Sequence, residues 1–192
     1  MFIRNNKRVN INSKLIIDGV HYNSEYFKNP TNREAFGITE IPDPVRKDER
    51  FYFVEEIDDS PYVINTPKPL EYVKDYLWQQ IKSYRDRLQS GGFKVGDKWY
   101  HSDIDSRIKI LGLVILGSSI PAGLQWKTMD GTFAEMTQTL ATQIFGAAAS
   151  HDTSIFAIAE NHRNNINALE TIEELEAYDY TIDWPDTYET SV

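Results

Sequence analysis

The sequence predicts an α+β fold: a β-rich N-terminal part of short hairpins, followed by a three-helix domain with two inserted β-hairpins and a long last helix. The spacing of the apolar residues carries this prediction. In residues 1–68 they form short runs between turn-forming pairs, whereas from residue 70 onward they recur every three or four positions. The proline-rich run 66–69 is a stiff connector, so we place the boundary there, with domains at 1–68 and 69–169.

Turn-forming pairs predict the hairpins of the first domain. Asn5-Asn6 and Asp18-Gly19 each lie between short apolar runs. These residue types tolerate the positive φ that a two-residue hairpin turn requires. A third hairpin is expected around the acidic loop 55–60. The expected strand pairs are 2–4 with 9–11, 15–17 with 20–22, and 50–54 with 62–64.

Capping signals predict where the helices begin and end. Ser and Thr side chains accept hydrogen bonds from the first helical turn, and Gly or Pro stops a helix. The expected caps are Thr31 (with Glu34), Ser102, Thr137 and Thr171 (with Glu174), and the expected stops are Gly37, Gly91-Gly92 and Pro121. After the boundary these signals enclose three helices, whose apolar faces run from Leu70 to Leu88, from Ile104 to Ile115 and from Leu140 to Leu169.

The second and third of these helices are expected to organise the domain. The second is apolar on nearly every side, which predicts a central position. Its first face is Ile104, Ile108, Leu111 and Ile115, and the residues that widen this face are Ile110, Leu113 and Val114. The third spans about eight turns, or ~45 Å, and is therefore a spine of the domain or a coiled-coil arm. Gly96-Asp97 and Asp130-Gly131 predict the inserted hairpins.

The net negative charge is concentrated at the C-terminal end. The chain has 192 residues, with 20 Lys and Arg against 29 Asp and Glu. Residues 164–192 hold eight of the acids and no Lys or Arg, which leaves 21 acids against 20 bases elsewhere. No basic stripe is present, so nucleic-acid binding is not expected. Neither a membrane span nor a signal peptide is expected, because no long uninterrupted apolar run occurs.

The acidic segment 170–192 is predicted to be a docking segment. An acidic stretch that only solvates the chain would be poor in aromatic residues, whereas this one contains several rings. It either packs back on its own domain or anchors in another subunit. The predicted partner-binding residues are Tyr178, Tyr180, Ile182, Trp184 and Tyr188, with Asp183 and Asp186.

Catalytic and metal sites are not expected, and no cofactor is implied. The chain has no Cys, which removes thiolate metal sites and Cys nucleophiles. His151 and His162 share a helix face but lie ~16 Å apart along the axis, too far to hold one metal ion. The run His101-Ser102-Asp103 contains the residue types of a hydrolase triad, but triads are assembled from distant segments.

A resemblance to a known family is carried by the run 92–103 (GFKVGDKWYHSD), by Ser106-Arg107 and Leu111-Gly112, and by 125–133 (QWKTMDGTF). The upstream pieces are 18–22 (DGVHY), 33–38 (REAFGI) and 48–52 (DERFY). The pieces within 92–133 resemble a domain of unknown function found in tailed-bacteriophage genes near those for tail fibres, and the upstream pieces resemble the N-terminal halves of such phage proteins. The resemblance implies a protein of the virion tail, made in the host cytoplasm, and supplies no catalytic residues.

The predicted function is therefore that of a non-enzymatic structural adaptor of a phage tail, whose partner is a tail or tail-fibre protein. Self-association is left open. Two alternatives remain: a fibre-assembly chaperone absent from the mature virion, and a carbohydrate- or receptor-binding module in which Trp99 or Trp126 would stack on sugar rings. We expect deletion of residues 170–192 to leave a folded domain that no longer binds its partner.

Overall fold

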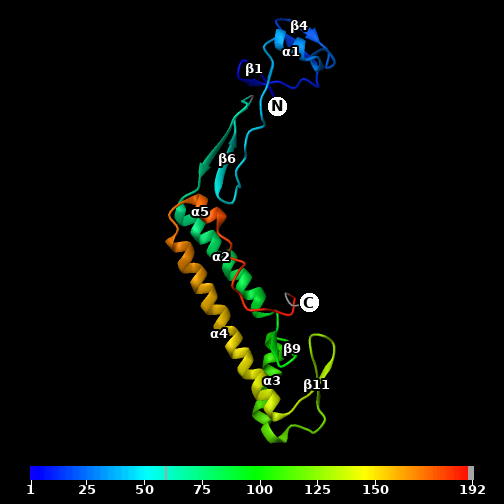
Figure 1. The fold of residues 1–192 in the computed structure, drawn as a ribbon, viewed down its shortest axis with the longest axis vertical. Coiled ribbons are helices and arrows are strands. Elements are labelled where there is room, and N and C mark those ends of the chain that lie inside the picture. The colour runs from blue at the N-terminus through cyan, green and yellow to red at the C-terminus, as the bar shows by residue number, and fades with distance from the viewer. Residues whose placement is uncertain (59, 190–192) are drawn as a thin grey trace. The chain divides into compact units, whose positions relative to one another are not determined.

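The computed structural model describes residues 1–58 and 60–189. Residue 59 of the predicted loop 55–60, and residues 190–192 of the predicted docking segment, lie outside the described residues. The chain forms two compact units, Met1–Pro69 and Leu70–Val192. The first contains short antiparallel hairpins and the second contains helices with interspersed hairpins (Figure 1), so the predicted α+β class is confirmed. No helix in the described part is long and apolar enough to cross a bilayer.

The N-terminal unit is built from short antiparallel pairings. Its strands are β1 (Phe2–Arg4), β2 (Lys7–Arg8), β3 (Leu15–Ile17), β4 (Val20–Tyr22), β5 (Thr39–Glu40), β6 (Tyr52–Glu56) and β7 (Val63–Pro67). They pair in the order β2-β1-β5, with β3-β4 and β6-β7 as separate hairpins. In the β3-β4 turn, Asp18 and Gly19 have φ of 50° and 79°, as expected for this hairpin. A small core of Ile11, Ile17, Phe27 and Ile38 lies beneath them.

The short helices of this unit are η1 (Tyr26–Lys28) and α1 (Pro30–Ala35). The expected cap of α1 is wrong by two residues. Asn29, not Thr31, is the capping residue, because its side chain accepts a hydrogen bond from the Thr31 amide and Pro30 occupies the first helical position. Gly37 follows the helix with φ of 64°, as expected of a C-terminal stop.

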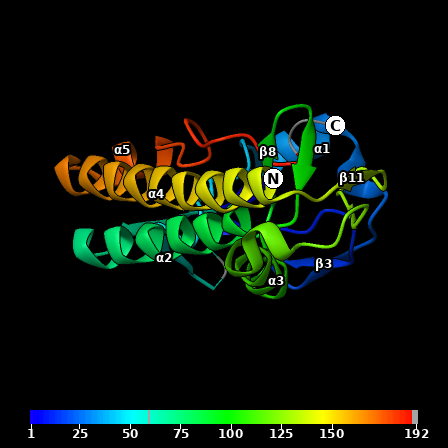
Figure 2. The same cartoon turned by 90° about the horizontal axis from the view of Figure 1, so that it is seen from below.

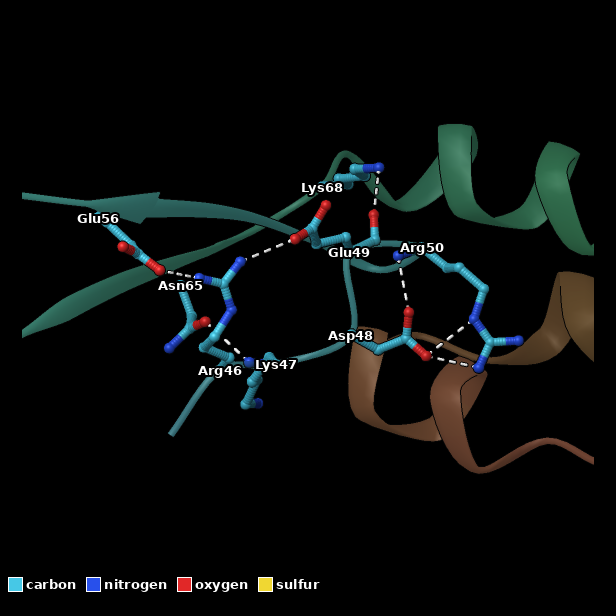
Figure 3. Close-up of polar contacts among 8 residues, drawn as sticks. All are labelled: Arg46, Lys47, Asp48, Glu49, Arg50, Glu56, Asn65 and Lys68. Carbon is cyan, nitrogen blue, oxygen red and sulfur yellow. Dashed lines mark hydrogen bonds and ion pairs between the residues drawn. The ribbon is translucent and has the colours of Figure 1, made fainter. Parts of the chain in front are cut away.

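A polar network holds the segment 46–49 along the β6-β7 hairpin (Figure 3). Arg46 forms ion pairs with Glu56 and, at 3.0 Å, with Glu49. The Asn65 Oδ1 atom accepts a hydrogen bond of 3.0 Å from the Lys47 amide, and the Lys68 Nζ atom donates one of 2.7 Å to the Glu49 carbonyl. These bonds hold the segment before β6 against both strands, so these charges serve the structure of their own unit.

The second unit has α2 (Leu70–Gln89), α3 (Ile104–Leu116), α4 (Gln138–Ala168) and α5 (Ile172–Ala177), with a 3-10 turn η2 (Gly117–Ser119) after α3. Helices α2 and α4 lie side by side (Figure 1) and run antiparallel. Lys74 near the start of α2 donates to the Asn167 carbonyl at the end of α4, and Gln89 at the end of α2 contacts Asp152 in the first half of α4.

Helix α3 and two hairpins complete this unit at one end of the α2-α4 pair (Figure 2). The hairpins are β8 (Phe93–Val95) with β9 (Lys98–Tyr100), and β10 (Gln125–Lys127) with β11 (Phe133–Glu135). Their inward residues Phe93, Tyr100 and Ala134 form one core with Ile110 of α3 and Ile144 of α4. This core therefore buries the Ile110 side of α3.

Three of the cap predictions in this unit have clear outcomes. The Thr137 side chain accepts a hydrogen bond from the Leu140 amide, and Thr171 forms a capping box with Glu174, so both predictions are confirmed. The expected cap Ser102 is wrong, because Asp103 caps α3. The Ser102 Oγ atom is buried and accepts a hydrogen bond of 2.9 Å from the Gly92 amide instead.

Candidate protein-interaction site

One face of α3 is an exposed apolar stripe. Ile104, Ile108, Leu111 and Ile115, which we call the α3 stripe, are 74%, 62%, 41% and 77% exposed. Ile110 on the opposite side is only 4% exposed. The expectation that α3 is central is therefore wrong, since only its Ile110 side packs on α4 and the hairpins. The spacings of four, three and four residues keep the stripe on one side of the helix.

Two helical glycines at this end of the unit are not required by the packing of the chain itself. Gly112 in α3 and Gly146 in α4 are exposed, and a Cβ atom built on either would meet nothing within 4 Å. A glycine inside a helix costs about 1 kcal/mol relative to alanine. The packing of this chain does not need either glycine, but each would allow another chain to come close to the helix.

The predicted docking segment is ordered on its own unit. We call residues 178–188 the strap, which follows α5 and runs back along α2 (Figure 1). The Trp184 ring lies between Tyr84 of α2 and His162 of α4, with ring-centre distances of 5.6 and 5.3 Å. Its indole N–H donates a hydrogen bond of 2.8 Å to the Tyr180 carbonyl. Of the two arrangements considered for this segment, the structure contains the packing on its own domain.

Buried His162 anchors the middle of the strap. Its Nε2 atom lies 3.1 Å from the Ile182 carbonyl, which can only accept, so Nε2 carries the proton. Its Nδ1 atom then accepts from the Tyr178 hydroxyl at 2.6 Å, and that hydroxyl accepts from Asn165 at 3.2 Å. The position of His162, eleven residues from His151, is thus explained by strap binding rather than by metal binding.

The end of the strap is fitted to Gly91. Thr187 is buried, and a Cβ atom on Gly91 would lie 2.8 Å from both its Cβ and Cγ2 atoms. The Tyr188 amide donates a hydrogen bond of 3.0 Å to the Gly91 carbonyl, and the Tyr188 ring contacts Trp99, with the ring centres 6.2 Å apart. Gly91 therefore provides space for the strap, whereas the positive φ after α2, of 85°, belongs to Gly92.

The strap divides its predicted partner-binding residues into two groups. Tyr178, Tyr180, Trp184 and Tyr188 contact the helices or the β8-β9 hairpin of the same unit. Ile182, Asp183 and Asp186 are exposed. No hydrogen bond or ion pair within the described ranges engages the carboxylates of Asp183 and Asp186. The rings thus hold the strap in place, and these two carboxylates face outward.

The residues with the side-chain types of a catalytic or metal site do not come together in one site. Asp103 caps α3 through Ser106, and its pKa is lowered by hydrogen bonds from that residue. Ser102 is buried against Gly92, and His101 is exposed. Among residues 1–58 and 60–189, no three His, Cys, Asp or Glu side chains are placed together to hold a metal ion. Trp99 and Trp126 are both half-buried.

Replacing Gly91 by Ala is expected to release the end of the strap. The new methyl group would displace Thr187, and the hydrogen bond from the Tyr188 amide to residue 91 would be lost. We expect a loss of about 1 kcal/mol in unfolding free energy, together with faster amide exchange at Tyr188. The matched control is Gly146→Ala, where the methyl group meets open space. Protection of the Tyr188 amide equal to that of the wild type would contradict the fit.

Comparison with known proteins gives one match. Residues 72–182 match a family described as a domain of unknown function, DUF4376. The match covers more than half of the chain and includes most of α2, all of α3, α4 and α5, and the first part of the strap. No curated protein and no solved structure matches the chain.

Proposed function

The chain belongs to the DUF4376 family, and from this premise we propose that it is a non-enzymatic structural adaptor of a bacteriophage tail. In this role it binds a tail or tail-fibre subunit through protein-protein contacts and resides in the virion tail after synthesis in the host cytoplasm. The viral setting is supported by the sequence resemblance of the runs 92–103 and 125–133. The family is itself of unknown function, so the mode of action is argued from the surface of the second unit.

The α3 stripe is the observation that carries the proposal. Large apolar side chains that are exposed side by side mark protein-interaction sites. The two faces of α3 differ in this respect, since the Ile110 side is already buried in the core. Asp105 and Lys109 are exposed on the same helix and would supply the polar rim that surrounds the apolar centre of an interface. Binding of a partner would remove the stripe from water.

The strap supplies a second, charged surface. Asp183 and Asp186 are held facing outward by the packed rings around them, so an approaching subunit meets a fixed arrangement of negative charge. Such charges contribute more to orientation and to the rate of association than to affinity. We therefore assign affinity to the α3 stripe, and orientation toward a basic surface of the partner to the strap.

The affinity assigned to the stripe is tested by Ile108→Asp. We expect this substitution to weaken binding to the tail or tail-fibre partner at least about tenfold, or ~1.4 kcal/mol, because it places a charge in the apolar centre of the contact. The matched control is Ala157→Asp, which adds the same single charge at an exposed α4 position outside the stripe. Binding is measured by calorimetry with purified tail and tail-fibre proteins. Equal affinities of the two variants would contradict the proposal.

Oligomeric state and virion content complete the test. If Ile108→Asp converts a wild-type oligomer into a monomer without changing the binding of any tail protein, the stripe joins copies of this chain and the adaptor role is wrong. Mass spectrometry of purified particles then decides between a structural component and the second candidate. A chain that binds a fibre protein but is absent from particles is an assembly chaperone.

A further inference from the structure

A small apolar pocket lies beside the α3 stripe, between α3 and α4. It has a volume of about 180 Å³ and is half open to solvent. Its apolar lining comes from Phe93, Ile110, Ile144 and Ala148, which belong to β8, α3 and α4. Arg107 and Asp152 also line it and are joined there by an ion pair. We propose that this pocket receives one aromatic side chain of the protein that docks on the α3 stripe, an inference that rests on the proposed function.

The size of the pocket favours a single ring. An engineered apolar protein cavity of about 150 Å³ binds benzene, and this pocket is only slightly larger. A larger cofactor or a nucleotide would not fit, since binding sites for drug-sized ligands begin at about 300 Å³. Aromatic side chains that enter a pocket next to a flat apolar contact commonly supply most of the binding energy of an interface.

The charges of the pocket favour an uncharged ligand. Arg107 is bound by both carboxylate oxygens of Asp152 and donates through Nε to the Ser102 carbonyl. Burial acts to raise the pKa of Asp152, but the hydrogen bonds and charge of Arg107 outweigh it and hold this pKa below its usual value. The charges of Arg107 and Asp152 therefore cancel, so neither of these two side chains offers an unpaired counter-charge to an anionic or cationic ligand. A ring can still lie against the guanidinium plane of Arg107.

The position of the pocket favours a side chain over a free small molecule. Arg107, which lines the pocket, lies three residues after Ile104 and four before Leu111, so it borders the stripe, whereas Ile110 lines the pocket from the core side of α3. A helix or strand laid along the stripe and across Arg107 would therefore reach the pocket. Phe145, also in the lining, is 44% exposed and would contact the same partner.

Indole is the probe that tests the pocket. Its binding to the full chain is monitored by nuclear magnetic resonance. We expect saturable shifts confined to the amides of the pocket residues. Ala149→Leu, at an exposed position in the lining, should fill the pocket and weaken indole binding on the order of tenfold. Ala157→Leu makes the same change at an exposed α4 position outside the lining and should bind indole as the wild type does.

The same variants separate this inference from the proposed function. If Ala149→Leu loses both indole binding and tail-protein affinity but keeps its melting temperature, this would support the insertion of a partner's aromatic side chain into the pocket. No saturable indole binding, or equal binding by both variants, would overturn the pocket while leaving the Ile108→Asp test of the adaptor intact. If Ala149→Leu loses indole but keeps full affinity for the tail protein, the pocket takes free small aromatics and the inference is wrong.

Discussion

Leu175→Ala is expected to lower the free energy of unfolding by about 3 kcal/mol. Leu175 is completely buried, at 0% exposure, and lies on α5, which packs on α2. Removing a buried leucine side chain loses its transfer energy and leaves a cavity. Urea unfolding at neutral pH measures the difference, and Glu176→Ala, at an exposed position of the same helix, is the control. A Leu175→Ala variant as stable as this control would contradict the docking of α5.

The packing of α5 and the strap also changes the expectation for a truncated chain. The sequence alone suggested that a chain without residues 170–192 would remain folded and lose only its partner. In the structure this segment contributes buried Ile172, Leu175 and Thr187, and it covers Tyr84 and His162 with Trp184. Truncation after Leu169 should therefore cost more than Leu175→Ala alone, and it is unsuitable as a test of partner binding.

His151→Leu is expected to raise the free energy of unfolding by about 2 kcal/mol. His151 is 9% exposed, and neither of its ring nitrogens has a hydrogen-bond partner among the described residues. The ring lies beside Phe93, with the ring centres 6.1 Å apart, so a side chain of similar size without polar atoms suits the site better. His151→Gln is the control, because it keeps unpaired polar atoms at this position without a titrating ring.

The same residue predicts a dependence of stability on pH. Burial lowers the pKa of His151 below its ordinary value of 6.5, Asp152 opposes this shift, and Arg107 adds to it. The unfolded chain therefore takes up a proton at a higher pH than the folded chain, so stability is lost as pH falls through 6.5 toward the lower folded-state pKa. When unfolding is measured from roughly pH 8 down to pH 5, the free energy of unfolding of the wild type should begin to fall near the ordinary His pKa. Neither variant should show this contribution. Parallel pH profiles for wild type and His151→Leu would contradict the assignment.

Features that depend on a few neighbouring residues were predictable. The Asp18-Gly19 turn forms because these two residues accept positive φ whatever surrounds them. The Thr171 capping box forms because Glu174 reaches back within one helical turn. The predicted cap of α3 was wrong because two neighbouring residues could serve as the cap. The Asp103 side chain accepts the hydrogen bond from the first-turn amide, whereas Ser102 accepts one from Gly92, ten residues away in the chain.

Features that depend on distant packing were not predictable. The sequence shows that α3 is apolar on several sides but not which side α4 covers. That choice depends on where Phe93, Met136 and Ile144 meet Ile110 in space. The pocket could not be read from the sequence for the same reason, since its lining comes from three separate elements. For the strap, the rings indicated that a contact surface was needed, but Tyr84 and His162 come together to contact Trp184 only once α2 and α4 have paired.

The order of these elements along the chain has a consequence for synthesis. The strap follows α2 and α4, so it leaves the ribosome after both helices have emerged. Until then the residues that Trp184 covers, Tyr84 and His162, and the surface under Leu175 are open to water and to cellular holdases. Nascent chains arrested before residue 170 should thus be captured and digested more readily than chains released after residue 189.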